Sequence, residues 1–216
     1  MDSRQNRTHD YLFRIRLEGT FGVGKTCKTS LLRRYAVGEF TENHTSRTIG
    51  PELRVKTVNH GNKSIKLNLW DHYIDQRFKP QTTKHFKTCH GILLMYGVTH
   101  RESFELIENY YADMVWAAPT CQIFVVGNKI DAENARKVTF DEGSQLAGRL
   151  RIPFFEISAK TGDGVTEIVN ELLTQMIKTE EKIDKKDSKD QKTLKNEYIT
   201  KLGQDYQTEC KTSTCF

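Results

Sequence analysis

The 216-residue sequence predicts an α/β fold: an open, mostly parallel six-stranded sheet with one antiparallel edge hairpin strand and helices on both faces. Three observations predict it. Short apolar runs at 91–98 and 123–127 flank a helical stretch at 104–116, which is the βαβ pattern of a parallel sheet. Two alternating segments are joined by a tight turn, and a glycine-rich motif lies between a strand and a helix.

The glycine-rich motif follows the first predicted strand, Tyr11–Leu17. Residues 19–26 read G-T-F-G-V-G-K-T, which matches the phosphate-binding pattern G-x-x-x-x-G-K-[ST], and residues 27–36 have helical spacing. In such a loop, backbone N–H groups face one anion, Lys25 reaches the terminal phosphates and the Thr26 hydroxyl ligates magnesium. The fold class is therefore that of a P-loop NTPase.

The later elements complete the sheet. Alternation at 53–59 and 64–70, with His60-Gly61-Asn62 between them, predicts an edge hairpin. Pro153–Ile157 predicts a last strand, and apolar residues at one helical spacing over 165–177 predict a closing amphipathic helix. We expect one domain over residues 1–178, followed by a flexible polar tail over residues 179–216.

Composition excludes several classes of protein. The longest apolar run, Ile92–Tyr96, is too short to span a membrane, and the N-terminus lacks the apolar stretch of a secretory signal, so we expect a cytoplasmic protein. Five cysteines without a C-x-x-C pair indicate neither a zinc site nor a disulfide framework. The net charge of +5, without aromatics interleaved among basic clusters, argues against nucleic-acid binding. We expect a monomer.

Two further motifs follow predicted strands. Gly127-Asn128-Lys129-Ile130-Asp131 comes after one strand and Ser158-Ala159-Lys160 after the last. Ligands of open α/β sheets bind at this carboxyl edge. The Asp131 carboxylate could accept hydrogen bonds from N1 and the 2-amino group of guanine, and adenine lacks the amino donor. The pair of motifs therefore predicts a guanine-binding site.

Together these motifs resemble those of the small Ras-like GTPases, and the Rab family most of all. The Rab resemblance rests on Y-L-F before the P-loop, R-T-I-G at 47–50, K-L-N-L-W-D at 66–71, R-F at 77–78 and H-G-I at 90–92, and it covers residues 11–178. It implies a vesicle-trafficking switch that binds GTP or GDP with Mg²⁺. Its partners would be effectors, an exchange factor and a GAP, bound through the switch I and switch II segments.

The resemblance also implies roles for individual residues. Phe40 would pack on the guanine, Asp71 would hold a magnesium-bound water, and Thr48 would close on magnesium and the γ-phosphate. The magnesium site would thus be formed by Thr26, Thr48 and Asp71. The Ala159 N–H would bind the base carbonyl. Between Phe40 and Thr48 this chain has one residue more than the usual Rab spacing. The implied GTP-binding residues are Gly19, Gly22, Val23, Gly24, Lys25, Thr26, Cys27, Phe40, Thr48, Asp71, Asn128, Lys129, Asp131, Ser158, Ala159 and Lys160.

Switch II departs from the Rab pattern W-D-T-A-G-Q-E-R-F, because residues 70–78 read W-D-H-Y-I-D-Q-R-F. Ile74 replaces a glycine whose N–H meets the γ-phosphate, and Asp75 replaces the glutamine that orients the attacking water. A carboxylate there adds negative charge where the reaction concentrates it. We expect slow hydrolysis, with Asp75, Gln76, Thr48 and Lys25 as the candidate catalytic residues.

Two functions other than a nucleotide-dependent switch remain as alternatives. A non-catalytic guanine-nucleotide-binding scaffold would also explain Ile74 and Asp75. A small-molecule kinase on the same P-loop would not explain N-K-I-D and has no lid-like insertion. Phe21 would in addition crowd the space that an arginine from a GAP enters.

Charged residues and cysteines leave further alternatives open. Arg16 and Glu18 lie two residues apart on a central strand, where they could pair with each other or mark a solvated strand end. Cys210 and Cys215 near the C-terminus could be prenylated, which would attach the protein to the cytoplasmic face of endomembranes, or the tail could stay unlipidated.

Overall fold

The computed structural model describes residues 9–19, 27–41, 52–71 and 86–187, and within them it contains one six-stranded sheet. The strand order is β2-β3-β1-β4-β5-β6. Only β2 and β3 are antiparallel; every other neighbouring pair is parallel. The predicted fold class is confirmed. The strands are β1 (Tyr11–Gly19), β2 (Glu52–His60), β3 (Lys63–Asp71), β4 (Gly91–Gly97), β5 (Gln122–Asn128) and β6 (Phe154–Ile157).

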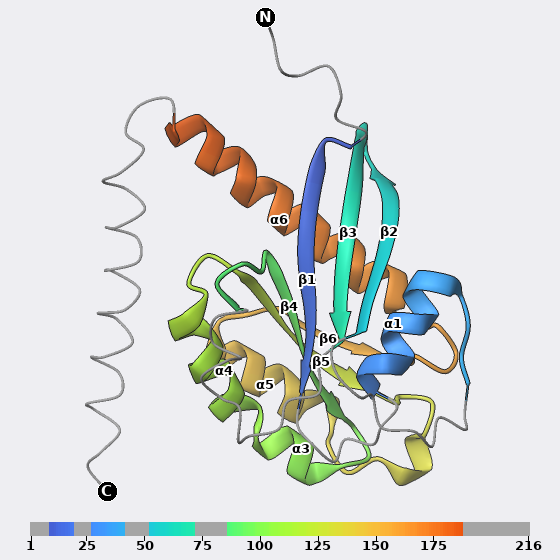
Figure 1. Cartoon of the computed structure of the whole chain (residues 1–216). Coiled ribbons are helices and arrows are strands. Elements are labelled where there is room, and N and C mark those ends of the chain that lie inside the picture. The colour runs from blue at the N-terminus through green and yellow to red at the C-terminus, as the bar shows by residue number, and fades with distance from the viewer. Residues whose placement is uncertain (1–8, 20–26, 42–51, 72–85, 188–216) are drawn as a thin grey trace, which may run out of the picture.

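Helices cover both faces of the sheet (Figure 1). One face carries α1 (Cys27–Val37) and α6 (Val165–Asp187), and the other carries α3 (Arg101–Glu105), α4 (Ile107–Ala117) and α5 (Phe140–Leu150). The single helical stretch predicted over 104–116 is divided in the structure, because α3 ends before Leu106 and α4 begins after it. A short 3-10 helix at Glu133–Ala135 follows β5.

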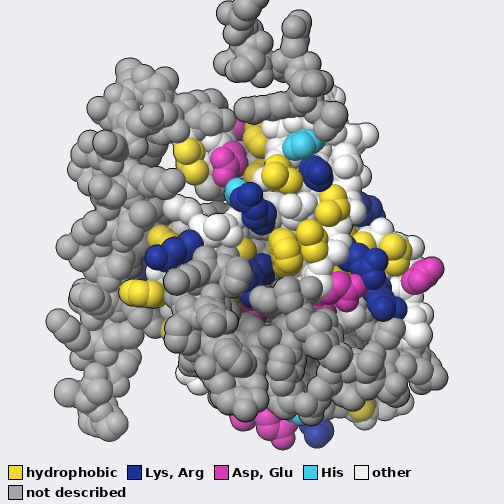
Figure 2. Space-filling model, in the orientation of Figure 1, with side chains coloured by type: hydrophobic (Ala, Val, Ile, Leu, Met, Phe, Trp, Pro, Cys, Tyr) yellow, Lys and Arg dark blue, Asp and Glu magenta, His cyan; other side chains and the backbone are white. Residues whose placement is uncertain are grey.

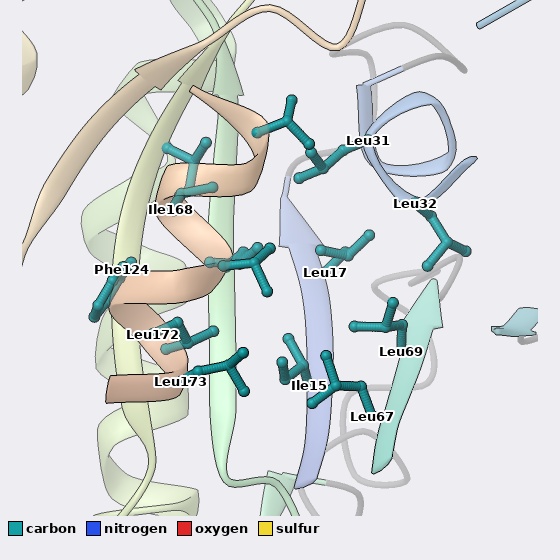
Figure 3. Close-up of a cluster of buried hydrophobic side chains, with 14 of the residues drawn as sticks. Ile15, Leu17, Leu31, Leu32, Leu67, Leu69, Phe124, Ile168, Leu172 and Leu173 are labelled. Atoms are coloured by element: carbon teal, nitrogen blue, oxygen red, sulfur yellow. The ribbon is translucent and has the colours of Figure 1, made fainter. Parts of the chain in front are cut away.

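The larger core lies between the sheet and the α1–α6 layer. Leu31 and Leu32 of α1 point toward the side chains of β1 and β3 (Figure 3). Leu172 and Leu173 of α6 fill the same layer, and all four leucines are at most 2% exposed. The helical spacing of the apolar residues in 27–36 and 165–177 thus marks the faces that are buried.

The opposite face of β1 carries a buried ion pair. Arg16 Nε donates to Glu18 Oε1 at 2.7 Å, and the two residues are 3% and 0% exposed. The Arg16 guanidinium lies 4.9 Å from the ring centroid of Phe86. The two side chains therefore pair with each other, and the alternative of a solvated strand end is wrong.

Helix α6 continues past Lys178 to Asp187 and contacts the sheet there. Gln122 Nε2 donates to Thr179 Oγ1 at 3.2 Å, and Lys63 Nζ donates to Glu181 Oε1 at 2.8 Å. The last helix is therefore longer than its apolar spacing predicts, because these polar contacts extend it beyond the hydrophobic core. None of the helices in the described ranges is long and apolar enough to cross a bilayer.

Candidate functional site

The carboxyl edge of β5 and β6 brings together the residues predicted to bind the base. Asn128 is the last residue of β5, is 2% exposed, and accepts hydrogen bonds at Oδ1 from the backbone N–H of Lys129 at 2.8 Å and of Ala159 at 3.0 Å. Ser158 Oγ donates to Asp131 Oδ1 at 2.6 Å. The two loops are thereby joined, and the Asp131 carboxylate is held at an exposed position. We call this network the base loops.

Two details of the base loops differ from what the sequence suggests. Lys129 has a positive φ of 76°, which is uncommon for a residue with a side chain and indicates a backbone constrained by its neighbours. The Ala159 N–H, which the resemblance assigns to the base carbonyl, donates to Asn128 in this structure. The asparagine therefore positions the loop that carries Ala159.

Arg34 of α1 connects the base loops to the end of its own helix. Its Nε donates to Ala159 O at 2.9 Å, its Nη2 donates to Lys160 O, and its Nη1 donates to Gly38 O at 2.9 Å. Its guanidinium also lies 5.9 Å from the ring centroid of Phe40. Sequence reasoning missed Arg34, because no motif distinguishes it from an ordinary surface arginine of a helix.

The phosphate end of the candidate site lies where β1 and β3 end and α1 begins. Gly19 is the last residue of β1, and a Cβ there would lie 2.4 Å from the carbonyl oxygen of Met95, so only glycine fits. Asp71, the last residue of β3, is 2% exposed. Burial raises the pKa of Asp71 and outweighs the hydrogen bond from Thr29 and the charge of Lys28, which both lower it.

Lys28 and Thr29, in the first turn of α1, make the contacts at this end. Thr29 Oγ1 donates to Asp71 Oδ2, and Lys28 Nζ donates to Gly19 O at 3.3 Å. Neither residue belongs to the set predicted from the motif. A signal was present, because a second Lys-Thr pair stands three residues after Lys25-Thr26.

The Arg16–Glu18 ion pair of β1 lies next to the phosphate end of the site. Burial raises the pKa of Glu18, while the charges of Arg16 and Lys28 lower it. Among the described residues, Arg16 Nη2 and Glu18 Oε2 have no hydrogen-bond partner. Buried charge at this end is therefore only partly compensated.

Several predicted site residues lie outside the described residues: Phe21, Gly22, Val23, Gly24, Lys25, Thr26, Thr48, Ile74, Asp75, Gln76, Cys210 and Cys215. Cys27 is the first residue of α1, and its side chain is not described. The structure thus places Gly19 and Asp71 beside the first turn of α1, and Phe40 beside Arg34, which contacts the base loops. The roles predicted for all of the site residues stay predictions.

Comparisons with known proteins agree with this geometry. The sequence profile of the Ras family matches residues 15–178. The Ras-related protein SEC4 of Candida albicans is 38% identical over 168 residues, which cover 77% of this chain and 78% of that protein. The Ras-related protein Rab-8A of Gallus gallus is 36% identical over 181 residues, 83% of this chain and 84% of that protein. The Ras-related protein Rab-3 of Caenorhabditis elegans is 36% identical over 169 residues, 78% and 75% of the two chains.

Proposed function

The chain belongs to the Rab group of the Ras family of small GTPases, and we propose that it binds GTP and GDP with magnesium as a vesicle-trafficking switch at cytoplasmic membranes. The observation that carries the proposal is the pair of base loops. Asn128 accepts a hydrogen bond from the Ala159 N–H, and Ser158 donates one to Asp131, so the two loops are held together by contacts within the protein. Loops that are joined by such hydrogen bonds lose little conformational freedom when a nucleotide binds.

Guanine selectivity follows from the chemistry of Asp131. Its carboxylate only accepts hydrogen bonds, and guanine offers two donors, N1–H and the 2-amino group. Adenine lacks the amino group, so an adenine nucleotide would leave a carboxylate acceptor unpaired. Arg34 supports this site indirectly, because it joins the carbonyl groups of Ala159 and Lys160 to α1.

The residues present at the phosphate end fit a magnesium ion. Mg²⁺ prefers oxygen ligands and usually binds one or two carboxylates, water and phosphate. Asp71 offers a buried carboxylate, and a threonine hydroxyl already contacts it. When bound, Mg²⁺ would offset the negative charge of the phosphates. With Asp71, the residues predicted to hold it are Thr26 and Thr48.

We further propose that hydrolysis is slow. The proposal rests on Ile74 and Asp75 in place of a glycine and a glutamine. Asp75 cannot donate a hydrogen bond to the reacting phosphate when ionised, and its charge opposes the charge that develops there. Gln76 is the residue that could orient water instead, while Lys25 and Thr48 would stabilise the phosphates.

An exposed apolar surface on the hairpin supports binding of effector proteins. Figure 2 shows hydrophobic side chains gathered over β1, β2 and β3, and the exposed ones are Leu12, Leu53 and Val55, at 37%, 40% and 53%. Leu53 and Val55 pair in register with Trp70 and Asn68, so they share one face of the sheet. The proposed partners are effectors and an exchange factor, and prenylation of Cys210 or Cys215 would attach the protein to membranes.

A single-turnover assay tests the proposal. The purified protein is loaded with GTP and Mg²⁺, and bound nucleotide and released phosphate are followed together, beside a conventional Rab protein and the variant Ile74→Gly/Asp75→Gln. We expect stable GTP binding, slow phosphate release, and faster release in the double variant. A rate equal to that of the conventional Rab would contradict slow hydrolysis. Failure to bind either guanine nucleotide would contradict the switch, and GTP retained uncleaved even by the double variant would favour the scaffold.

A further inference from the structure

Strands β1, β2 and β3 have one face covered by helices and one that is not. Phe13 and Ile15 of β1 and Ile65 and Leu67 of β3 are buried in the core shared with α1 and α6. Side chains alternate between the two faces along a strand, so the residues between these lie on the other side, which we call the outer face. The core beneath α3, α4 and α5 includes no side chain of β1, β2 or β3, so within the described ranges no helix packs on the outer face (Figure 1).

The outer face combines exposed apolar side chains with cations (Figure 2). Side chains two residues apart on a strand are separated by about 7 Å and neighbouring strands by about 5 Å, so three rows on three strands measure about 14 by 10 Å. An α-helix with its side chains is about 10–12 Å in diameter, so one helix matches this area. From the start of β1 toward the phosphate end, the outer face carries Leu12 beside Lys66, then Arg14, Asn68 and Val55 in one row, then Leu53.

On the covered face of the same strands, the cations are paired. Arg54 Nη2 lies 2.7 Å from Glu52 Oε1, and Lys63 Nζ lies 2.8 Å from Glu181 Oε1. These contacts join neighbouring residues of β2, and β3 to α6. The charges on this side of the sheet are therefore satisfied within the protein.

The cations of the outer face are different. Arg14 is exposed and Lys66 is half-buried, and neither side chain has a hydrogen-bond or salt-bridge partner in the part of the chain that the structure describes. Among the described residues of these strands, the one acid on this side is Glu18, which is buried and paired with Arg16. The exposed part of the outer face is therefore apolar and positively charged.

We propose that the outer face binds an amphipathic helix of a partner protein, in which Asp and Glu side chains border the apolar stripe. Leu12, Leu53 and Val55 would contact the stripe, and Arg14 and Lys66 would pair with the carboxylates. The inference rests on the proposed function in that the partner is an effector, and it adds the chemistry by which that effector is recognised. Two cations are too few to hold an anionic membrane, which takes clusters of about four to eight.

A display library of amphipathic peptides tests the proposal. Each peptide has about 18 residues with leucines along one stripe, and the positions that border the stripe are randomised. The library is first depleted on the full-length Val55→Asp variant, so that the peptides retained by the wild type are those that need the outer face. The wild type is presented with a non-hydrolysable GTP analogue, with GDP and without nucleotide, after loading has been measured.

We expect Asp and Glu to be enriched at the bordering positions. The tightest peptide should bind Arg14→Glu/Lys66→Glu at least about tenfold more weakly, because like charges then face each other. Replacing the acids of the peptide with lysines should restore binding to this double variant. Lys178→Glu makes the same charge change at an exposed residue of α6 and should bind like the wild type. Thermal unfolding and GDP affinity check that each variant folds.

Enrichment of basic or uncharged bordering residues, no enrichment at all, or equal binding by the double variant would overturn the inference. Attachment to phosphatidylserine vesicles that the double variant loses, with no peptide enriched, would assign the face to a membrane and also overturn it. A protein that retains no guanine nucleotide would contradict the proposed switch, whereas acidic peptides selected by that same protein would still support the inference.

Discussion

The base end and the phosphate end of the site differ in how their buried polar groups are compensated. At the base end, Asn128 and Ser158 each have hydrogen-bond partners within the protein. At the phosphate end, burial raises the pKa of Glu18 and of Asp71, and Arg16 Nη2 and Glu18 Oε2 lack partners among the described residues. The polar groups of the base end are thus satisfied within the protein, whereas the phosphate end holds buried carboxyl groups whose negative charge a bound cation would offset.

The largest expected effect is a loss of stability, and it tests whether the buried charge of Glu18 needs its partner. Arg16→Met should lower the free energy of unfolding by about 3–5 kcal/mol near neutral pH, because it leaves Glu18 buried and without its partner. Urea unfolding measures the change. The double variant Arg16→Met/Glu18→Leu should recover most of the loss, since two apolar side chains remove the need for a partner. A double variant as unstable as the single one would contradict this account.

The destabilisation caused by Arg16→Met should depend on pH. Burial raises the pKa of Glu18 above its ordinary value of 4.5, so the folded state binds this proton more tightly than the unfolded state. Such a group contributes stability below its unfolded pKa and loses it as pH rises through the folded pKa. Arg16→Met should therefore lower the free energy of unfolding less at about pH 5 than at about pH 8. An equal cost at both pH values would exclude a buried, titrating Glu18.

Asp131→Ala tests the organised base end. Removing the carboxylate should weaken GDP binding by about 100-fold, because two charge-assisted hydrogen bonds to the base are lost, and it should reduce the preference over adenine nucleotides. The free energy of unfolding should fall by only about 1 kcal/mol, because Asp131 is exposed and its loss removes one hydrogen bond, the one from the buried Ser158 hydroxyl. Competition between GDP and ADP for the site measures both effects. Glu133→Ala, another exposed acid beside the loop, is the control and should bind GDP normally.

Arg34→Ala should have a smaller effect. The arginine acts through the loop and contacts Ala159, Lys160 and Gly38, so its loss should speed GDP release by about tenfold without abolishing guanine selectivity. Arg34→Lys keeps the charge but cannot form all three hydrogen bonds, so it should be intermediate. Release of fluorescent GDP measures the rate. An unchanged rate in Arg34→Ala would mean that the base loops hold their positions without α1.

The smallest effect is expected outside the site, at the start of α5. Hydrogen bonds from the Thr139 backbone and the Arg101 and Thr139 side chains lower the pKa of Glu142 to about 2. A lowered pKa contributes stability above the unfolded value of 4.5 that is lost as pH falls toward about 2. Glu142→Gln should therefore be slightly less stable near neutral pH, with a difference that shrinks below about pH 4.5 in thermal unfolding. Nucleotide affinity should not change, and a change would mean that α5 is coupled to the site.

Local patterns in the sequence were sufficient for most of the fold. The apolar runs at β4 and β5 and the alternation of the hairpin predict strands, because side chains alternate along a strand and a buried strand is apolar on both faces. The base loops were also predicted in place, since each motif directly follows its strand. The extension of α6 past Lys178 was not predicted, because it makes polar contacts with distant strands through Thr179 and Glu181. The break at Leu106 was not predicted either, and nothing in the structure explains it.

The sequence by itself thus determined the order of strands and helices and the family, and it led to the residues that we propose recognise guanine. Only the tertiary structure decided that Arg16 and Glu18 pair inside the protein, that Arg34 joins α1 to the base loops, and that Thr29 contacts Asp71. A sequence motif specifies only residue types and their spacing along the chain. The side chain that meets Asp71 depends on where α1 begins and how it packs against β3, which is a non-local property of the fold.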